Sequence, residues 1–304
     1  MYNKYLRYGT LAALCFVIFL GYFFSDKKEE TVSSADSTNM QTVIFKDESD
    51  TLIPVSVDIG NENEPEKNYR GIIEMMKSSD YTAMGLYPLL DPELEINTLI
   101  MEQNQLTFDF TDHLQVKDNQ EALDICEAFS YLFCQNGIEK VNIQIEGQAV
   151  STLENSTIPL SCITNQLGIN NFETSTSDLY KTSSVVIYNE KNIEGQTYYV
   201  PVTTRIDDLH SSLDNKVSLL LDNFENPVKI KTNQECTLED GILSVYLSSQ
   251  VLNDSEAISP VLYQRLEKSL LSLPDVSQVE IYIDQQLIDK NQEVSSIIDN
   301  KIQL

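Results

Sequence analysis

The stretch Thr237-Leu238-Glu239-Asp240-Gly241-Ile242-Leu243-Ser244-Val245-Tyr246-Leu247 carries the sequence signals that decide the fold. An Asp-Gly pair between two apolar runs is a strong signal for a tight hairpin turn. After the turn, every second residue is apolar from Leu243 to Leu247, as expected for a strand with one buried face. The stretch therefore predicts a hairpin in a half-buried sheet.

The residues that follow this hairpin predict a helix and a further strand. Ser259-Pro260 is a typical helix start, with serine as the cap and proline in the first turn. An amphipathic stripe then follows at helical spacing. Its members are Ile258, Val261, Leu262, Leu266, Leu270 and Leu273. Val279, Ile281 and Ile283 alternate and predict a half-buried strand.

The residues before the hairpin predict two strands and a helix. Val185–Tyr188 and Thr197–Thr203 are apolar runs on either side of a turn stretch, residues 189–196, that contains Gly195. Pro201 places the second of these strands at a sheet edge or a bulge. A helix is predicted next from apolar residues at helical spacing. They are Leu213, Val217, Leu220, Leu221 and Phe224.

The same order of elements occurs earlier in the chain. Leu106, Phe108 and Phe110 match Leu243, Val245 and Leu247 at an offset of 137, and the final strands match at 138. The first copy also contains a hairpin proline, Pro54, and an apparent capping box at Asp118 and Glu121. Matched elements at near-constant offsets indicate an internal repeat.

We therefore predict an α+β protein with two tandem modules. The first module is residues 42–150 and the second is residues 183–290, each a small, mostly antiparallel sheet with two helices packed on one face. Residues 25–41 are predicted to be a flexible stalk, residues 151–182 a linker, and residues 291–304 a tail with a short helix.

Residues 1–24 predict a membrane anchor. Tyr8–Phe24 contains no charged residue, and seventeen helical residues span about 25 Å. The anchor residues are Tyr8, Leu11, Leu14, Phe16, Ile18, Leu20 and Phe24. A cleaved signal peptide and a lipoprotein lipidated at Cys15 are the alternatives. The short N-terminal tail favours a single-pass signal anchor in the cell membrane, with the later domains outside the cytoplasm.

The charge of the chain limits its partners. The chain has 47 acidic and 20 basic residues, and a net charge of −27 argues against binding to nucleic acid. Beyond residue 24 the net charge is −29, so identical subunits repel one another. This favours basic partners and a hetero-complex over a homo-oligomeric ring, and leaves self-association open.

The sequence contains no catalytic or metal-binding motif with the residue types and spacing that its chemistry requires. His113 and His210 lack a metal-ligand spacing, and no glycine-rich phosphate loop is present. We therefore expect no enzyme activity, no cofactor and no metal site. Three acidic pairs are interpreted as surface charge: Asp109 with Asp112, Asp207 with Asp208, and Asp284 with Asp289. The alternatives are a weak cation site, a glycosidase pair or a hydrolytic site assembled by the fold.

Two further groups of residues have both a structural and a functional interpretation. Tyr198-Tyr199 could line a groove, although tyrosines in strands usually pack within the sheet. Cys126 and Cys134 are eight residues apart on a predicted helix, too far for a disulfide, whereas Cys162 and Cys236 could pair.

The repeated unit resembles the GerM domain of bacterial sporulation and spore germination proteins. The resemblance rests on Tyr199–Thr203, Leu219–Leu221, Asp240–Ser248 and Val276–Ile283, and in the first copy on Pro54, Leu106–Phe110 and Val141–Gly147. The second copy departs from the pattern at Gln285, where the first has Gly147. Together the two copies cover about two thirds of the chain.

The resemblance implies ring-building modules that act through protein–protein contacts outside the cytoplasm. It predicts a membrane-anchored, non-catalytic assembly or scaffold factor in endospore formation or germination, whose partners are other envelope or sporulation proteins. The alternative is an extracytoplasmic envelope-binding module, unrelated to sporulation, that holds peptidoglycan or cations.

Overall fold

The computed structural model describes residues 39–60, 64–171, 179, 181–224, 230–253, 257–288 and 300. The predicted anchor, almost all of the stalk and most of the tail, with its predicted short helix, lie outside the described residues. None of the helices within the described ranges is long and apolar enough to cross a membrane.

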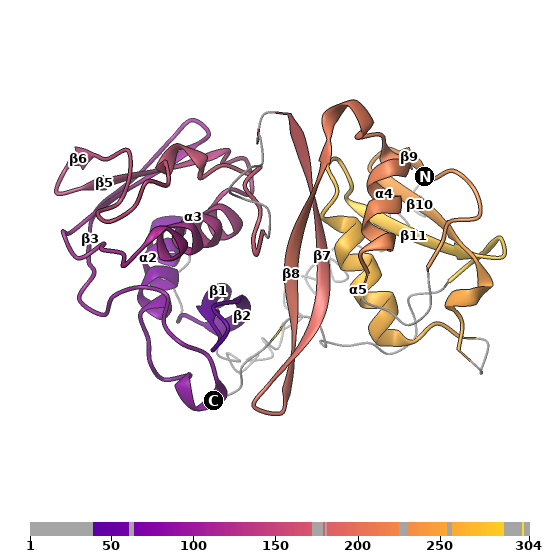
Figure 1. The fold of residues 1–304 in the computed structure, drawn as a ribbon, viewed down its shortest axis with the longest axis horizontal. Helices are drawn as coiled ribbons and strands as arrows, with labels where there is room; N and C mark the ends of the chain where they lie inside the picture. The colour runs from indigo at the N-terminus through magenta and orange to yellow at the C-terminus, as the bar shows by residue number, and fades with distance from the viewer. Residues whose placement is uncertain are drawn as a thin grey trace, which may run out of the picture. The chain divides into compact units, whose positions relative to one another are not determined.

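The first module contains an opening hairpin, two helices and a four-stranded sheet (Figure 1). Strands β1 (Met40–Lys46) and β2 (Leu52–Asp58) form the antiparallel hairpin. The main helices are α2 (Pro65–Met76) and α3 (Asn119–Phe133). The sheet has the order β3-β4-β5-β6, with bounds Ile96–Glu102, Gln105–Phe110, Lys140–Ile145 and Gln148–Ala149.

The second module repeats this arrangement, so the predicted internal repeat is confirmed. Strands β7 (Thr182–Ile193) and β8 (Gln196–Asp207) form its hairpin, and α4 (Leu213–Asp222) and α5 (Pro260–Leu271) are its helices. The sheet order is β9-β10-β11-β12. These strands are Thr237–Glu239, Ile242–Leu247, Gln278–Ile283 and Gln286–Leu287. Short 3₁₀ turns are η1 (Thr82–Met84), η2 (Leu160–Cys162), η3 (Asp208–His210) and η4 (Ser249–Val251).

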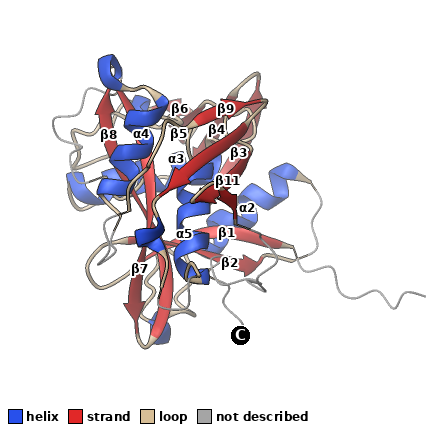
Figure 2. Ribbon diagram, turned by 90° about the vertical axis from the view of Figure 1, so that its right-hand side faces the viewer, coloured by secondary structure: helices blue, strands red, loops and turns tan. Residues whose placement is uncertain are grey.

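The four-stranded sheets are mostly antiparallel, as predicted, but each contains one parallel pair. The central pairs β4 with β5 and β10 with β11 run parallel, because a helix connects the two strands of each pair. The opening hairpins are separate two-stranded sheets. Helix α3 contacts both β1 and β5, and α5 contacts both β7 and β11, so these helices lie between a hairpin and a four-stranded sheet (Figure 2).

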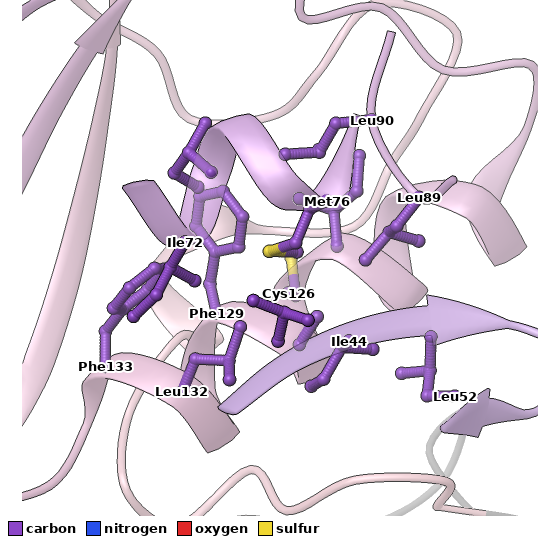
Figure 3. Packing of buried hydrophobic residues seen from close by; sticks show 14 of the residues in the cluster. Ile44, Leu52, Ile72, Met76, Leu89, Leu90, Cys126, Phe129, Leu132 and Phe133 are labelled. Atoms are coloured by element: carbon purple, nitrogen blue, oxygen red, sulfur yellow. The ribbon is translucent and has the colours of Figure 1, made fainter. Parts of the chain in front are cut away.

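The core of the first module is built from the apolar periodicity of its strands and helices. Figure 3 shows Ile44 of β1, Met76 of α2 and Phe129 of α3 directed toward one another. Phe108 of β4 packs against Phe129 and Phe133 with ring centroids 5.7 and 5.0 Å apart. This density of aromatic contacts fixes α3 against the sheet.

Two local predictions need correction. Residues 189–196 are not a long turn, because β7 and β8 continue to Ile193 and Gln196. Only Glu194 and Gly195 form the turn, and both have positive φ, which matches the twist of a tight hairpin. At α3, Asp118 accepts hydrogen bonds from Gln120 N and Glu121 N, but Glu121 accepts from Lys117 N, one residue before the cap.

The helix start at Ser259-Pro260 differs in part from the prediction. Pro260 occupies the first turn of α5 as expected, but the Ser259 side chain makes no capping hydrogen bond. The fixed φ of proline is therefore the local feature that favours the start of this helix.

The hairpin prolines lie at edge-strand positions where the lack of an N–H group removes no hydrogen bond from the sheet. Pro54 pairs with Ile44, and Pro201 pairs with Tyr188. The carbonyl oxygen of Pro201 accepts a hydrogen bond from outside the hairpin, from the side chain of Asn170. The prediction that Pro201 lies on an edge strand is confirmed.

Candidate functional site

The hairpin β7–β8 contributes side chains to two hydrophobic cores. Val185 and Ile187 pack into the core of the second module. Ile193, Tyr198 and Val200, nearer the tip, are buried in the core of the first module. Because burial of large apolar side chains is the main stabilising term in folding, the hairpin holds the two modules together.

Tyr188 connects both modules from the middle of the hairpin. Its hydroxyl lies 3.0 Å from the hydroxyl of Tyr131 on α3 of the first module. Its backbone N–H donates to Ser269 Oγ on α5 of the second module, at 3.0 Å. Burial raises the pKa of the Tyr188 hydroxyl, so this group stays protonated.

Two asparagines join the outer edges of β2 and β8. The side chain of Asn170 accepts from Leu52 N and donates to Leu52 O and Pro201 O, at 2.8–2.9 Å. Asn300 donates to Pro54 O at 2.6 Å and exchanges hydrogen bonds with the backbone of Tyr199. These carboxamides satisfy backbone groups that a sheet edge would leave open.

An ion pair closes the same junction near the hairpin tip. Lys191 of β7 pairs with Asp47, and its Nζ donates to Thr51 Oγ1 at 2.6 Å. Burial alone would raise the pKa of Asp47, but hydrogen bonds from Lys191 and from the Thr51 and Ser49 backbones lower it. The Asp47 carboxylate is therefore held in its charged form.

Residues 151–171 of the connecting segment are packed against the first module. The buried apolar residues of this stretch are Leu153, Leu160, Ile163, Leu167 and Ile169. Thr203 of β8 donates its N–H to Ile169 O and accepts from Ile169 N through Oγ1, at 2.9 and 2.8 Å. Gly168 has φ +83°, and a Cβ there would lie 2.4 Å from Thr203 Oγ1, so only glycine fits.

Gly85 allows a second close approach at the hairpin tip. It has φ +72°, and a Cβ at this position would lie 2.5 Å from Ile193 Cγ2. The tip of the second hairpin therefore fits directly against the backbone of the first module.

Arg265 fixes α5 to β7 within the second module. Its guanidinium donates to Tyr188 O, Glu190 Oε1 and Asn189 Oδ1 at 2.9–3.1 Å, and it lies 4.5 Å from the centre of the Phe224 ring. Arg265 itself is only 5% exposed. A planar guanidinium meets all of these partners at once, which a lysine ammonium does not.

Helix α3 carries two buried acids, Asp124 and Glu127. Burial raises the pKa of Asp124 despite its hydrogen bonds from Gln120 and Lys46. Burial raises the pKa of Glu127 to about 8, and the hydrogen bond from Asn171 N, at 3.3 Å, offsets only part of this. Near neutral pH the Glu127 side chain therefore carries a proton.

The cysteines are arranged differently from the pairing considered from the sequence. Cys126, Cys134, Cys162 and Cys236 are all free thiols. Cys162 packs with the first core, next to Cys126, and Cys236 packs in the second core. The hydrogen bond with Cys162, together with burial, raises the pKa of Cys126, so Cys126 is an unreactive thiol.

The two tyrosines considered for a groove are packing residues. Tyr198 is fully buried and Tyr199 is 3% exposed. The hydroxyl of Tyr198 has no hydrogen-bond partner among the described residues, and burial raises its pKa.

The histidines and acidic pairs are not brought together into one site. His113 is exposed near Asp112 and Glu93, with N–O distances of 3.7 and 3.8 Å, whereas His210 lies in η3 of the second module. Asp109 is 7% exposed and accepts from Gly147 N at 2.7 Å, a structural role at the sheet end.

The remaining acids also have local roles. Asp207 caps η3 through Leu209 N, and Asp208 accepts from Ser183 Oγ. Asp284 lies in the β11–β12 turn, and Asp289 falls outside the described residues. Over the described ranges, no group of three or more His, Cys, Asp or Glu side chains is placed to hold a metal ion.

The open surfaces of the two sheets are the remaining candidates for function, and they differ. On the first module, a depression of about 710 Å³ is lined mainly by amide and hydroxyl side chains. They include Gln103, Asn104, Gln105, Ser161, Asn165 and Gln166. A second depression of about 330 Å³ shares Lys140, Pro159 and Ser161 with it and adds Asn142 and Gln144. The open face of the second sheet instead carries Tyr246 and Tyr282, whose rings stack 5.0 Å apart.

The fold and these surfaces define a tandem α+β repeat protein whose two modules share one hairpin. No protein-family model matches the chain. The spore germination protein GerM of Bacillus subtilis (strain 168) is 21% identical to it over 278 residues, which cover 85% of this chain and 75% of that protein.

A solved structure has the same arrangement. The tandem GerMN domains of the sporulation protein GerM from Bacillus subtilis match with a TM-score of 0.69 and 17% identity, covering 82% of this chain and 92% of that chain. This chain therefore has the fold of two GerMN domains in tandem, in agreement with the resemblance of its two repeats to the GerM domain.

Proposed function

We propose that this chain is a membrane-anchored, non-catalytic assembly factor of endospore formation or germination. The observation that carries the proposal is the shared hairpin β7–β8, whose side chains are buried in both cores. A tandem unit held in this way presents fixed surfaces, which suits the docking of partner proteins. The similarity to a spore germination protein supports the biological setting.

The proposed site of action is the outer surface of the cell membrane. The uncharged segment Tyr8–Phe24 is the proposed anchor, and the short N-terminal tail favours export of the residues that follow. In this arrangement both modules face the space outside the cytoplasm and remain attached to the membrane.

The proposed partners are basic envelope or sporulation proteins. The exported part of the chain has a net charge of −29, which attracts cationic surfaces and disfavours a homo-oligomer. Strand β3 is an edge strand on which Ile100 and Met101 are 45% and 52% exposed. An exposed edge of this kind can pair with a strand of a partner.

The test is the number of heat-resistant colonies after deletion of the gene in its own host. We expect a large loss, restored by the full chain. A version with residues 1–24 replaced by a cleavable signal peptide is still exported, and we expect it not to restore the count. An unchanged count after deletion, in a strain without a second copy of the gene, contradicts the proposal.

The amide-lined depression of the first module favours one alternative, the binding of cell-wall polymer. Amide and hydroxyl side chains, such as Gln105, Asn142 and Ser161, can exchange hydrogen bonds with sugar hydroxyls and peptide groups. Co-sedimentation of the full chain with purified peptidoglycan tests this function without any sporulation partner. Binding that is lost in a Gln105→Leu, Asn142→Leu double variant would support the alternative, and no co-sedimentation would exclude it.

A further inference from the structure

The open face of the second sheet carries a row of three exposed or half-buried side chains on adjacent strands. Tyr246 of β10 is in register with Tyr282 of β11, which is in register with Leu287 of β12. The two rings stack at 5.0 Å with an angle of 23° between their planes, and Leu287 is 53% exposed. We call Tyr246, Tyr282 and Leu287 the tyrosine row.

The tyrosine row points away from the helices of its module. Neighbouring strand residues Val245, Leu247, Ile281 and Ile283 are at most 4% exposed and belong to the core. Because successive side chains of a strand alternate between faces, Tyr246 and Tyr282 lie on the opposite, open face.

The fold does not require aromatic residues at these positions. In the first module the corresponding register partners are Asp109, Gln144 and Ala149. The same sheet therefore forms with aspartate, glutamine and alanine at these positions in one module and with two tyrosines and a leucine in the other. A feature that packing does not require, and that exposes apolar surface, indicates a binding role.

The surroundings of the tyrosine row are acidic. The stretches 237–247 and 278–287, which form the strands and turns of this sheet, contain four acids and no lysine or arginine. Glu280, next to Tyr282 on the open face, accepts a hydrogen bond from the Tyr282 hydroxyl at 2.8 Å. Stacked rings beside a carboxylate match a guanidinium, which stacks on aromatic faces and forms paired hydrogen bonds with carboxylates.

We infer that the tyrosine row and Glu280 form a docking site for an arginine-containing, basic segment of a partner protein. The inference rests on the proposed function and specifies the partner of one surface. A second copy of this chain fits poorly because its surface carries the same negative charge. An anionic membrane surface is repelled for the same reason.

Fluorescence anisotropy with a labelled Arg-Gly repeat peptide tests the site, using the full chain in nanodiscs of neutral lipid. The test variant is Tyr282→Gln, which introduces the residue type found at Gln144 of the first module. The matched control is Tyr87→Gln. Tyr87 is 37% exposed and its hydroxyl lies 3.3 Å from Glu48, but it does not belong to the tyrosine row.

We expect Tyr282→Gln to weaken peptide binding at least about fivefold and Tyr87→Gln to leave it unchanged. A Lys-Gly peptide of equal charge should bind more weakly than the arginine peptide. Equal affinity of Tyr282→Gln and the unaltered chain would overturn the inference, as would an equal loss in both variants, which would indicate non-specific attraction. Thermal unfolding of both variants checks that each is folded.

Colony counts separate this inference from the proposed function. If deletion reduces heat-resistant colonies but Tyr282→Gln restores them fully, the docking site is wrong and the assembly role stands. If deletion has no effect while the peptide still binds at the tyrosine row, the assembly role is wrong and the docking site stands.

Discussion

The side chain of Asn170 hydrogen-bonds to both backbone polar groups of Leu52, accepting from its N–H and donating to its carbonyl oxygen. Its amide also donates to Pro201 O of the second hairpin. One carboxamide thus substitutes for a strand partner on the first hairpin and links it to the second. The junction between the modules therefore depends on polar contacts of defined direction as well as on apolar burial.

Replacement of Asn170 by alanine should destabilise the whole chain. The change leaves three backbone groups without their partner, and each unsatisfied buried group costs about 1–3 kcal/mol. Urea unfolding followed by circular dichroism measures the loss. Asn104→Ala, which removes one exposed bond to Glu139, is the control and should change stability by less than about 0.5 kcal/mol. Equal effects would contradict the role assigned to Asn170.

Gly85→Ala should be more destabilising than Gly137→Ala. Both glycines have positive φ, so alanine strains the backbone at either position by about 1–2 kcal/mol. Only at Gly85 would the new Cβ also clash with Ile193, whereas nothing lies within 4 Å at Gly137. We expect an extra loss of about 1–3 kcal/mol at Gly85, measured by thermal unfolding. Similar losses of stability in the two variants would show that the tip of the β7–β8 hairpin can move away from residue 85.

Removal of the hydroxyl groups of Tyr188 and Tyr198 should have opposite effects. Tyr188→Phe removes the bond to Tyr131 and should cost about 0.5–1.5 kcal/mol. Tyr198→Phe removes a buried hydroxyl that has no partner among the described residues, so it should be neutral or stabilising. Denaturant unfolding of the two variants side by side is the measurement. A large loss in Tyr198→Phe would mean that its hydroxyl is satisfied in solution.

Stability should fall as pH rises because of Glu127. Its pKa is raised from 4.5 to about 8 in the folded chain, so unfolding releases a proton between these values. The free energy of unfolding therefore decreases from about pH 4.5 to about pH 8. Glu127→Gln should flatten this dependence, and the raised pKa of Asp124 leaves a residual slope of the same sign. Urea unfolding at several pH values checks this, and an unchanged slope in the variant would contradict it.

Arg265→Lys should destabilise the second module by at least about 2 kcal/mol. Lysine cannot reproduce the set of bonds to Tyr188 O, Glu190 and Asn189 while lying over Phe224. Arg70→Lys is the control, because Arg70 is partly exposed and its ion pair with Glu66 is a surface pair. We expect a loss below about 1 kcal/mol for the control in the same thermal unfolding assay.

The sequence was sufficient to predict the elements and their repetition. The alternation of Leu243, Val245 and Leu247 and the constant offset to the first copy reflect local geometry and burial, which leave a periodic signal. The parallel pairing of β10 with β11 was not predicted, because the alternation alone does not distinguish parallel from antiparallel neighbours.

The junction between the modules could not be predicted in the same way. Burial of Tyr198 follows from its strand, but nothing in the pattern says that its neighbours belong to the other module. Asn170 lies in a polar stretch without periodicity, so its three hydrogen bonds leave no local signal. The tyrosine row is visible only once the register of β10, β11 and β12 is known.

Because of the shared hairpin, the repeated sequence unit and the segment of chain that builds one hydrophobic core do not coincide. The repeated unit begins at a hairpin, yet the tip of the second hairpin is buried in the first core through Ile193, Tyr198 and Val200. A cut between the two repeats would therefore expose these three side chains to water, so the boundary of the repeat is not the boundary of the hydrophobic core.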